Sequence, residues 1–267
     1  MKVIYLDCSM GAAGDMLMAA LYELLDDKQA FLDMMRSLGL PGIEISAEPA
    51  VKCGITGTHM KVLVHGSEEL DALHDHLHEH AHEHSHDYEH HHHTDLHEIE
   101  HLLSHLDLPQ TVRDDALAVY HRIAEAESKV HGRPVDQIHF HEVGTLDALA
   151  DVVGVCLLMH LLAPEKVYAS SVHVGCGQVK CAHGILPVPA PATALLLAGV
   201  PIYGGAIQGE LCTPTGAALL THFVTKFGEL PAMRLLKSGY GMGTKDFPAA
   251  NCVRAMLGEQ DAPTEEI

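Results

Sequence analysis

The opening stretch KVIYLDCSMGAAGDMLMAALYELL, residues 2–25, sets the class of fold. Residues 2–7 form the short apolar run of a buried strand, and the small residues 8–14 predict a loop. An apolar-periodic helix is expected from Asp15 to about Asp26. A strand, a glycine-containing loop and a helix in this order are typical of an α/β protein.

The rest of the chain continues this pattern on both sides of one abrupt change in composition. Helices are expected at 29–38, at 95–106 with Thr94 as N-cap, and at 109–130, 146–162, 189–198 and 215–227. A hairpin is expected at 43–53 and 56–65, and strands at 137–141 and 167–174. We therefore expect a mixed α/β (α+β) fold, a sheet with flanking helices. Residues 1–70 and 95–259 would form one domain around an insertion at 71–94, followed by an acidic tail at 260–267.

Charge and cysteine content limit the classes of partner and compartment. The 267 residues carry 16 Lys and Arg against 36 Asp and Glu, a net charge of −20. Such a chain attracts cations and repels nucleic acid and anionic membranes, so neither is expected as a partner. Seven cysteines without a CxxC pair indicate free thiols in a reducing compartment. With no signal-peptide pattern at the start, we expect a cytoplasmic protein. A homo-oligomer stays an open alternative.

The segment 74–93 is dominated by histidine, with eleven His and five acidic residues in twenty. It has no apolar face, so we interpret it as a disordered insertion. Neutral imidazole suits Ni, Zn, Cu and Co, and many interchangeable ligands bind several ions weakly. A solvated linker with incidental metal affinity is the alternative; an expression tag is disfavoured because the segment is internal and mixed with acids. The candidate ligands are His74, His76, His78, His80, His82, His84, His86, His90, His91, His92 and His93.

Three further histidines, His97, His101 and His105, are spaced i, i+4, i+8 on the helix that follows. This spacing places them on one helical face, where neighbouring imidazoles can chelate an ion. A solvated face beside the His-rich segment explains the same spacing equally well.

The segment HFHEVGTLDALAD, residues 139–151, combines two histidines with three acids. On a strand, His139 and His141 point to the same side, and Glu142 begins the turn that follows. Asp147 and Asp151 then lie one helical turn apart in an otherwise apolar helix. Buried carboxylates are costly unless they meet a cation or hydrogen-bond donors, so these residues are candidate metal ligands. A structural network with Asp147 at the helix N-terminus is the alternative.

Three segments are candidates for binding anions. Gly11 and Gly14 frame the first loop, where backbone N–H groups and the helix start can hold a phosphate or carboxylate, although no Walker A lysine is present. GCGQVKCAHGILPVPAPAT (175–193) and GELCTPTGAALL (209–220) supply further candidates. The anion-binding candidates are Gly11, Gly14, Asp15, Lys180, Thr213 and Thr215. Cys181 and Cys212 are candidate thiolate ligands, and buried Cys is the expectation for Cys8, Cys156 and Cys252.

These motifs together resemble the LarC family. DCSMGAAGDM, IHFHEVGTLDALADVVG, AHGILPVPAPAT and GELCTPTGAALL occur in this order around a His-rich insertion and span nearly the whole chain. The resemblance implies a protein that inserts Ni(II) into pyridinium-3,5-bisthiocarboxylic acid mononucleotide. The product is the nickel-pincer cofactor of lactate racemase-type enzymes, whose apoenzyme would be the downstream acceptor.

The resemblance also implies a CTP-dependent nickel insertase, a metal-chelating lyase that uses CTP with Mg(II) or Mn(II). Family members continue past a segment resembling ANCVRAMLGE (250–259) into a C-terminal domain that binds CTP, and we therefore place no CTP site in this chain. Forming a metal–carbon bond needs a base for the ring proton, and His183 or Glu210 is the candidate. Lys180 and the glycine loops would hold the phosphate and thiocarboxylates.

Two other functions fit parts of the sequence. A nickel chaperone or store would need only the His-rich segment, and the α/β motifs argue against it. A metal-dependent hydrolase built on HFHE and the aspartates is the second. Turnover that requires nickel or a C-terminal partner would favour insertion over hydrolysis.

Overall fold

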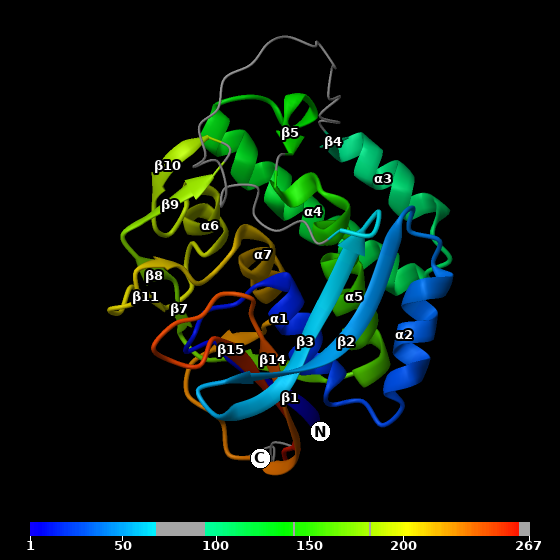
Figure 1. Ribbon diagram of the computed structural model, residues 1–267, viewed down its shortest axis with the longest axis vertical. Helices are drawn as coiled ribbons and strands as arrows, with labels where there is room; N and C mark the ends of the chain where they lie inside the picture. The colour runs from blue at the N-terminus through cyan, green and yellow to red at the C-terminus, as the bar shows by residue number, and fades with distance from the viewer. Residues whose placement is uncertain (68–93, 141, 182, 262–267) are drawn as a thin grey trace, which may run out of the picture.

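The computed structural model describes residues 1–67, 94–140, 142–181 and 183–261 (Figure 1). The predicted insertion and tail lie mostly or wholly outside these residues. Within them the fold is a mixed α/β arrangement, as expected, in which a central sheet is flanked by helices. No helix in the described ranges is long and apolar enough to cross a membrane.

The central sheet has seven strands in the order β13-β6-β1-β15-β14-β3-β2. They are β1 (Lys2–Asp7), β2 (Ile43–Lys52), β3 (Ile55–Val64), β6 (Lys166–Ala169), β13 (Lys226–Phe227), β14 (Arg234–Met242) and β15 (Cys252–Glu259). Strand β1 pairs parallel with β6 and antiparallel with β15. The sheet thus combines strands from both sides of the predicted insertion.

Short two-stranded pairs extend the fold away from this sheet. They are β4 (Thr94–Asp95) with β5 (His139–Phe140), β7 (Val172–His173) with β11 (Ile202–Tyr203), β8 (Gly175–Cys176) with β12 (Gly209–Glu210), and β9 (Gln178–Cys181) with β10 (Gly184–Pro187). These pairs carry several of the predicted site residues.

The helices pack in layers on the sheet. They are α1 (Gly14–Tyr22), α2 (Lys28–Ser37), α3 (Leu96–His105), α4 (Gln110–His131), α5 (Leu146–Leu162), α6 (Pro191–Leu196) and α7 (Pro214–Phe223), with 3₁₀ turns η1 (Val135–Gln137) and η2 (Glu142–Gly144). Helix α1 packs on β14, β15 and β3, and its other side meets α5, which in turn meets α4 (Figure 1). Helix α5 is apolar around most of its circumference because it lies between other helices.

Most predicted elements are present, but some boundaries were wrong. The strand expected at 137–141 is only the two-residue β5 after η1, and the strand expected at 167–174 is divided into β6 and β7. The N-cap of α3 is Asp95 rather than Thr94: its carboxylate accepts the N–H of Glu98, and Glu98 accepts the N–H of Asp95 in return. Strands β14 and β15 were not predicted at all.

Candidate functional site

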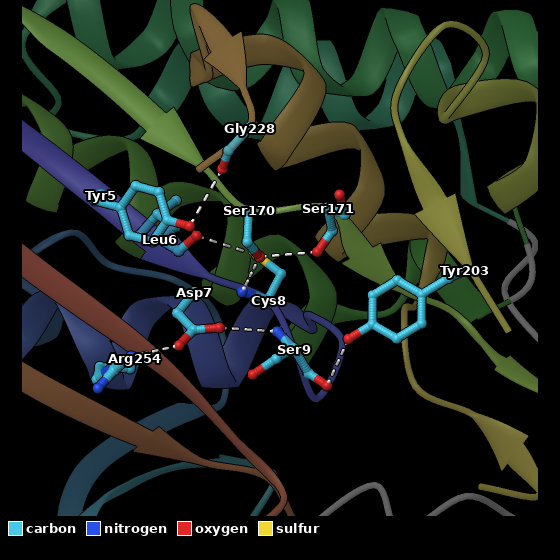
Figure 2. Close-up of polar contacts among 10 residues, drawn as sticks. All are labelled: Tyr5, Leu6, Asp7, Cys8, Ser9, Ser170, Ser171, Tyr203, Gly228 and Arg254. Atoms are coloured by element: carbon cyan, nitrogen blue, oxygen red, sulfur yellow. Dashed lines mark hydrogen bonds and ion pairs between the residues drawn. The ribbon is translucent and has the colours of Figure 1, made fainter. Parts of the chain in front are cut away.

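The loop after β1 is fixed by hydrogen bonds at the carboxyl end of that strand. Asp7 pairs with Arg254 of β15 at 2.7 Å and accepts the N–H of Ser9 at 3.1 Å (Figure 2). The N–H of Cys8 donates to the hydroxyl of Ser170 at 2.9 Å, and the hydroxyl of Tyr203 donates to the carbonyl of Ser9 at 3.2 Å (Figure 2). These contacts lock the position from which the loop enters α1.

The same loop packs directly on the segment 209–216. The N–H of Ala12 donates to the carbonyl of Leu211, and the N–H of Thr213 donates to the carbonyl of Ala12, both at 3.0 Å. A Cβ atom at Gly11, where φ is +87°, would lie 1.9 Å from the carbonyl oxygen of Leu211. A Cβ atom at Gly216 would lie 2.2 Å from the carbonyl oxygen of Ala12. Two motifs that are about 200 residues apart in sequence therefore form one backbone contact, which only glycine permits.

These contacts occupy some of the donors that were expected to hold an anion. The N–H of Gly11 donates to the carbonyl of Cys8 at 3.0 Å. The hydroxyl of Thr213 accepts the N–H of Gly216 as the N-cap of α7, and Thr215 is buried. Anion binding at Gly11, Gly14, Thr213 and Thr215 stays a prediction.

Three carboxylates gather where the N-terminal turns of α1 and α5 meet; we call Asp15, Asp147 and Asp151 the carboxylate cluster. A Cβ atom at Gly14 would lie 2.6 Å from Oδ2 of Asp151, so glycine is needed for this approach. The backbone N–H of Asp15 donates to the Asp151 carboxylate. The predicted pair on α5 thus acquires a third member, Asp15, which was expected to help bind an anion.

Burial controls the protonation of this cluster. Desolvation raises the pKa of Asp151 well above its usual range, and the charges of Asp15 and Asp147 raise it further. Desolvation also raises the pKa of Asp15, with Asp147 adding to the rise, while the N–H of Met16 and the nearby His59 oppose it. Carboxyl groups with these raised pKa values hold their protons more readily than isolated aspartates do.

Several polar atoms at the cluster are buried without a hydrogen-bond partner. They are Oδ1 of Asp147, Oδ1 of Asp151 and the hydroxyl of Tyr120 on α4. Tyr120 is fully buried, and its pKa is raised well above the usual value by desolvation and then by the charges of Asp147 and Asp151. Unsatisfied buried polar atoms are rare, and each calls for an explanation such as a bound ion, a water or a catalytic role. Tyr120 and His59 were missed, because neither stands in a motif; a lone His on β3 and a Tyr on an amphipathic helix are ordinary in sequence.

The structure describes the other residues of the HFHE segment only in part. His139 lies on β5 with an exposed side chain. His141 lies outside the described residues, and the side chain of Glu142 is not described either. Within the described ranges, no three His, Cys, Asp or Glu side chains already surround one metal position.

The remaining histidine candidates that the structure describes lie on the surface, on separate elements. Residues 74–93 lie outside the described residues. His97 and His101 on α3 are exposed, and the ring of His101 lies 4.3 Å from that of His105 between centroids. His183 follows β9 and packs against His131 at the end of α4, with ring centroids 4.8 Å apart.

The candidate base Glu210 lies in β12, which pairs with β8 and also contacts β9, the strand that carries Lys180. Lys180 is exposed. The candidates Glu210 and Lys180 therefore come from neighbouring strands, whereas His183 lies against α4. The catalytic roles of His183 and Glu210 stay predictions.

The cysteines divide by burial. Cys8, Cys156 and Cys212 are fully buried, as expected for the first two, and Cys252 is only partly buried. Desolvation raises the pKa of the Cys212 thiol well above its usual value, and Cys8 and Glu210 raise it further. This environment favours the thiol over the thiolate and argues against Cys212 as a metal ligand.

Comparison with known proteins gives a consistent result over the whole chain. The model of the family described as "Nickel insertion protein" matches residues 4–267. A protein of Desulfitobacterium hafniense is 41% identical over 259 residues, which is 97% of this chain and 59% of that protein. One of Clostridium acetobutylicum is 44% identical over 98% of this chain and 65% of its own length. Both are named "Pyridinium-3,5-bisthiocarboxylic acid mononucleotide nickel insertion protein".

The chain therefore spans about three fifths of the length of these relatives. A third relative, from Geobacillus kaustophilus, carries the same name and is 36% identical over 97% of this chain and 60% of its own. No solved structure matches the chain.

Proposed function

The chain belongs to the nickel insertion protein family, the LarC family, and from this we propose that it takes part in inserting Ni(II) into pyridinium-3,5-bisthiocarboxylic acid mononucleotide. The observation that carries the proposal is the 41% identity over 97% of the chain with a protein named for this reaction. The product would be the nickel-pincer cofactor, with lactate racemase-type apoenzymes as its acceptors.

The substrate and the ion make different demands on the protein. The mononucleotide brings a phosphate and two thiocarboxylates, which need positive or N–H-rich surroundings. Lys180, on the strand beside the one that carries Glu210, is the side chain that we assign to this task. Nickel in transit needs anionic or imidazole ligands, and the carboxylate cluster provides the former.

Formation of the nickel–carbon bond removes a proton from the pyridinium ring. In our proposal Glu210 or His183 accepts that proton, while nickel forms bonds to the ring carbon and the two sulfurs. The His-rich segment 74–93, together with His97 and His101, supplies the ion, and Asp147 and Asp151 hold it with His139, His141 or Glu142. The segment delivers nickel, and the α5 aspartates keep it during insertion.

We propose that this chain acts as part of a metal-chelating lyase whose reaction depends on CTP with Mg(II) or Mn(II). A C-terminal part that acts with this chain would bind the CTP. The protein would work in the cytoplasm.

Reconstitution tests the proposal. The chain is mixed with Ni(II), CTP, Mg(II) and the bisthiocarboxylate mononucleotide, with and without the C-terminal part of a family member, and nickel-pincer product is followed by mass spectrometry. We expect product only in the complete mixture. Product formation at the same rate without this chain would overturn the proposal, and nickel binding without product in the complete mixture would favour the storage function.

A further inference from the structure

His59 on β3 has the environment of a metal-binding imidazole. Its Nδ1 lies 3.0 Å from the carbonyl oxygen of Met242. A carbonyl only accepts hydrogen bonds, so Nδ1 carries the proton, and in the neutral ring Nε2 keeps its lone pair. Metal-binding histidines are commonly oriented in this way, by a backbone carbonyl at the other ring nitrogen.

The backbone brings His59 near Asp15 of the carboxylate cluster. The first turn of α1 lies on the end of β14: a Cβ atom at Gly241 would lie 1.9 Å from the carbonyl oxygen of Met16, and one at Gly243 would lie 2.9 Å from its Sδ. Met242, which holds His59, lies between these glycines, and Asp15 immediately precedes Met16. His59 is close enough to Asp15 to act on its charge.

The cluster also lacks a partner for its buried polar atoms. The hydroxyl of fully buried Tyr120 is unpartnered and lies near Asp147 and Asp151, each of which has an unpartnered buried Oδ1. No protein group forms a hydrogen bond with these three atoms. A cation between the carboxylates would coordinate the two Oδ1 atoms and orient the hydroxyl.

We propose that His59 is the nitrogen ligand that completes, with Asp15, Asp147 and Asp151, a binding site for one divalent transition-metal ion. An imidazole among carboxylates suits nickel better than magnesium or calcium, which prefer oxygen alone. The inference rests on the proposed function only in identifying the ion as the nickel that is to be inserted. In the described part of the chain no three such side chains surround one point, so the proposed site requires the carboxylates and His59 to move closer together when the ion binds.

A site that joins α1, α5 and β3 links metal binding to folding. An ion that binds only the folded state raises the melting temperature. An ion that binds side chains equally available in the folded and the unfolded chain does not. The test is the melting temperature of the full chain with and without Ni(II) alone. We expect a rise of several degrees for the unmodified protein and the loss of most of it in His59→Gln and Asp15→Asn.

The substitutions are chosen to preserve the fold. In His59→Gln the new carboxamide can still donate to the carbonyl of Met242, and in Asp15→Asn the side chain keeps its shape. The matched control is His160→Gln, since His160 is an exposed imidazole at the other end of α5 whose Nδ1 bonds to Thr111. The control should keep the full nickel-dependent rise. An undiminished rise in both His59→Gln and Asp15→Asn, or no rise in the unmodified protein, overturns the proposed site.

The reconstituted reaction separates this inference from the proposed function. If the complete mixture gives no pincer product while the nickel-dependent rise still requires His59, the function fails and the site stands. If product forms and His59→Gln matches the unmodified protein at every nickel concentration and in its melting temperature, the site fails and the function stands. We expect His59→Gln to give at least about tenfold less pincer product than the unmodified protein at every nickel concentration, as for loss of a metal-orienting or ligating group.

Discussion

At the scale of single residues, the buried carboxylate of Asp151 lowers the stability of the metal-free protein at neutral pH. Its native pKa is raised by burial and by two neighbouring carboxylates. The native state therefore holds the Asp151 proton more tightly than the unfolded chain does. The contribution of this proton binding to the free energy of unfolding is fully present below the ordinary carboxyl pKa of about 4. It is lost as pH rises through the raised native pKa of Asp151.

Asp151→Asn should therefore stabilise the metal-free protein at neutral pH. We expect a gain of about 1–2 kcal/mol in the free energy of unfolding at about pH 7, and a weaker fall in stability as pH rises above the ordinary carboxyl pKa of about 4, because the carboxamide has no charge to desolvate. Urea denaturation at several pH values measures both. The same substitution at exposed Asp107 should change neither, and a destabilised Asp151→Asn protein would contradict the interpretation of Asp151 as a desolvated carboxyl with an unpartnered Oδ1.

The thiols give a second prediction for single residues. Burial raises the pKa values of Cys8, Cys156 and Cys212, and all three are enclosed by the core. Iodoacetamide should label exposed Cys53 in the native protein at least about a hundredfold faster than these three, because it reacts with accessible thiolates. Peptide mass spectrometry after a timed reaction checks this. Rapid native labelling of Cys212 would restore it as a candidate metal ligand.

Among the elements, the contact between the loop after β1 and the start of α7 makes one unit from two distant motifs. Gly11→Ala should destabilise the protein by about 3 kcal/mol or more, because its Cβ atom would overlap the carbonyl of Leu211 in addition to the strain of a positive φ. Thermal or urea unfolding measures the difference.

The control separates backbone strain from overlap. Gly39 has a similar φ of +75° but nothing within 4 Å of a Cβ atom, so Gly39→Ala should cost only about 1 kcal/mol. Equal costs at the two glycines would show that the packing of Leu211 on Gly11 adds nothing.

Local pattern predicted those elements whose own residues form a continuous apolar or alternating run. Helix α5 was predicted with its observed ends, 146–162, and the hairpin β2–β3 was predicted within a residue or two. Strands β14 and β15 were not, although they lie in the middle of the sheet. Strand β14 contains Gly239 and Gly241, which weaken the strand pattern. The glycines are required because α1 lies on them: Cβ atoms there would approach Ala20 and Met16.

The candidate site, like the fold, was predictable only where the local sequence pattern indicates it. The two α5 aspartates could be found because charges on an apolar helix demand a partner. Asp15 was assigned to an anion site, since its approach to Asp151 depends on the packing of α1 against α5 and is absent from either segment alone. His59 and Tyr120 required the three-dimensional arrangement.

On the scale of the whole molecule, nickel supply and nickel use belong to different parts of the chain. The His-rich segment should bind more than one Ni(II) per chain at about pH 7.5, and this binding should weaken steeply below about pH 6, because only neutral imidazoles bind the ion. Calorimetry at both pH values checks the expectation. One site in total, or affinity that does not change with pH, would contradict it.

Excess nickel should compensate for loss of the supply but not for loss of the fixed site. A nickel titration of pincer-cofactor yield in the reconstituted reaction, with the C-terminal part present, tests this difference. One variant replaces residues 74–93 by a Gly/Ser segment of equal length, and the other carries Asp151→Asn. We predict that the first loses yield only at low nickel and recovers fully in excess, while the second stays inactive at every concentration. Recovery of Asp151→Asn in excess nickel would contradict this division, because Asp151 would then only raise nickel affinity and would not belong to the site of insertion.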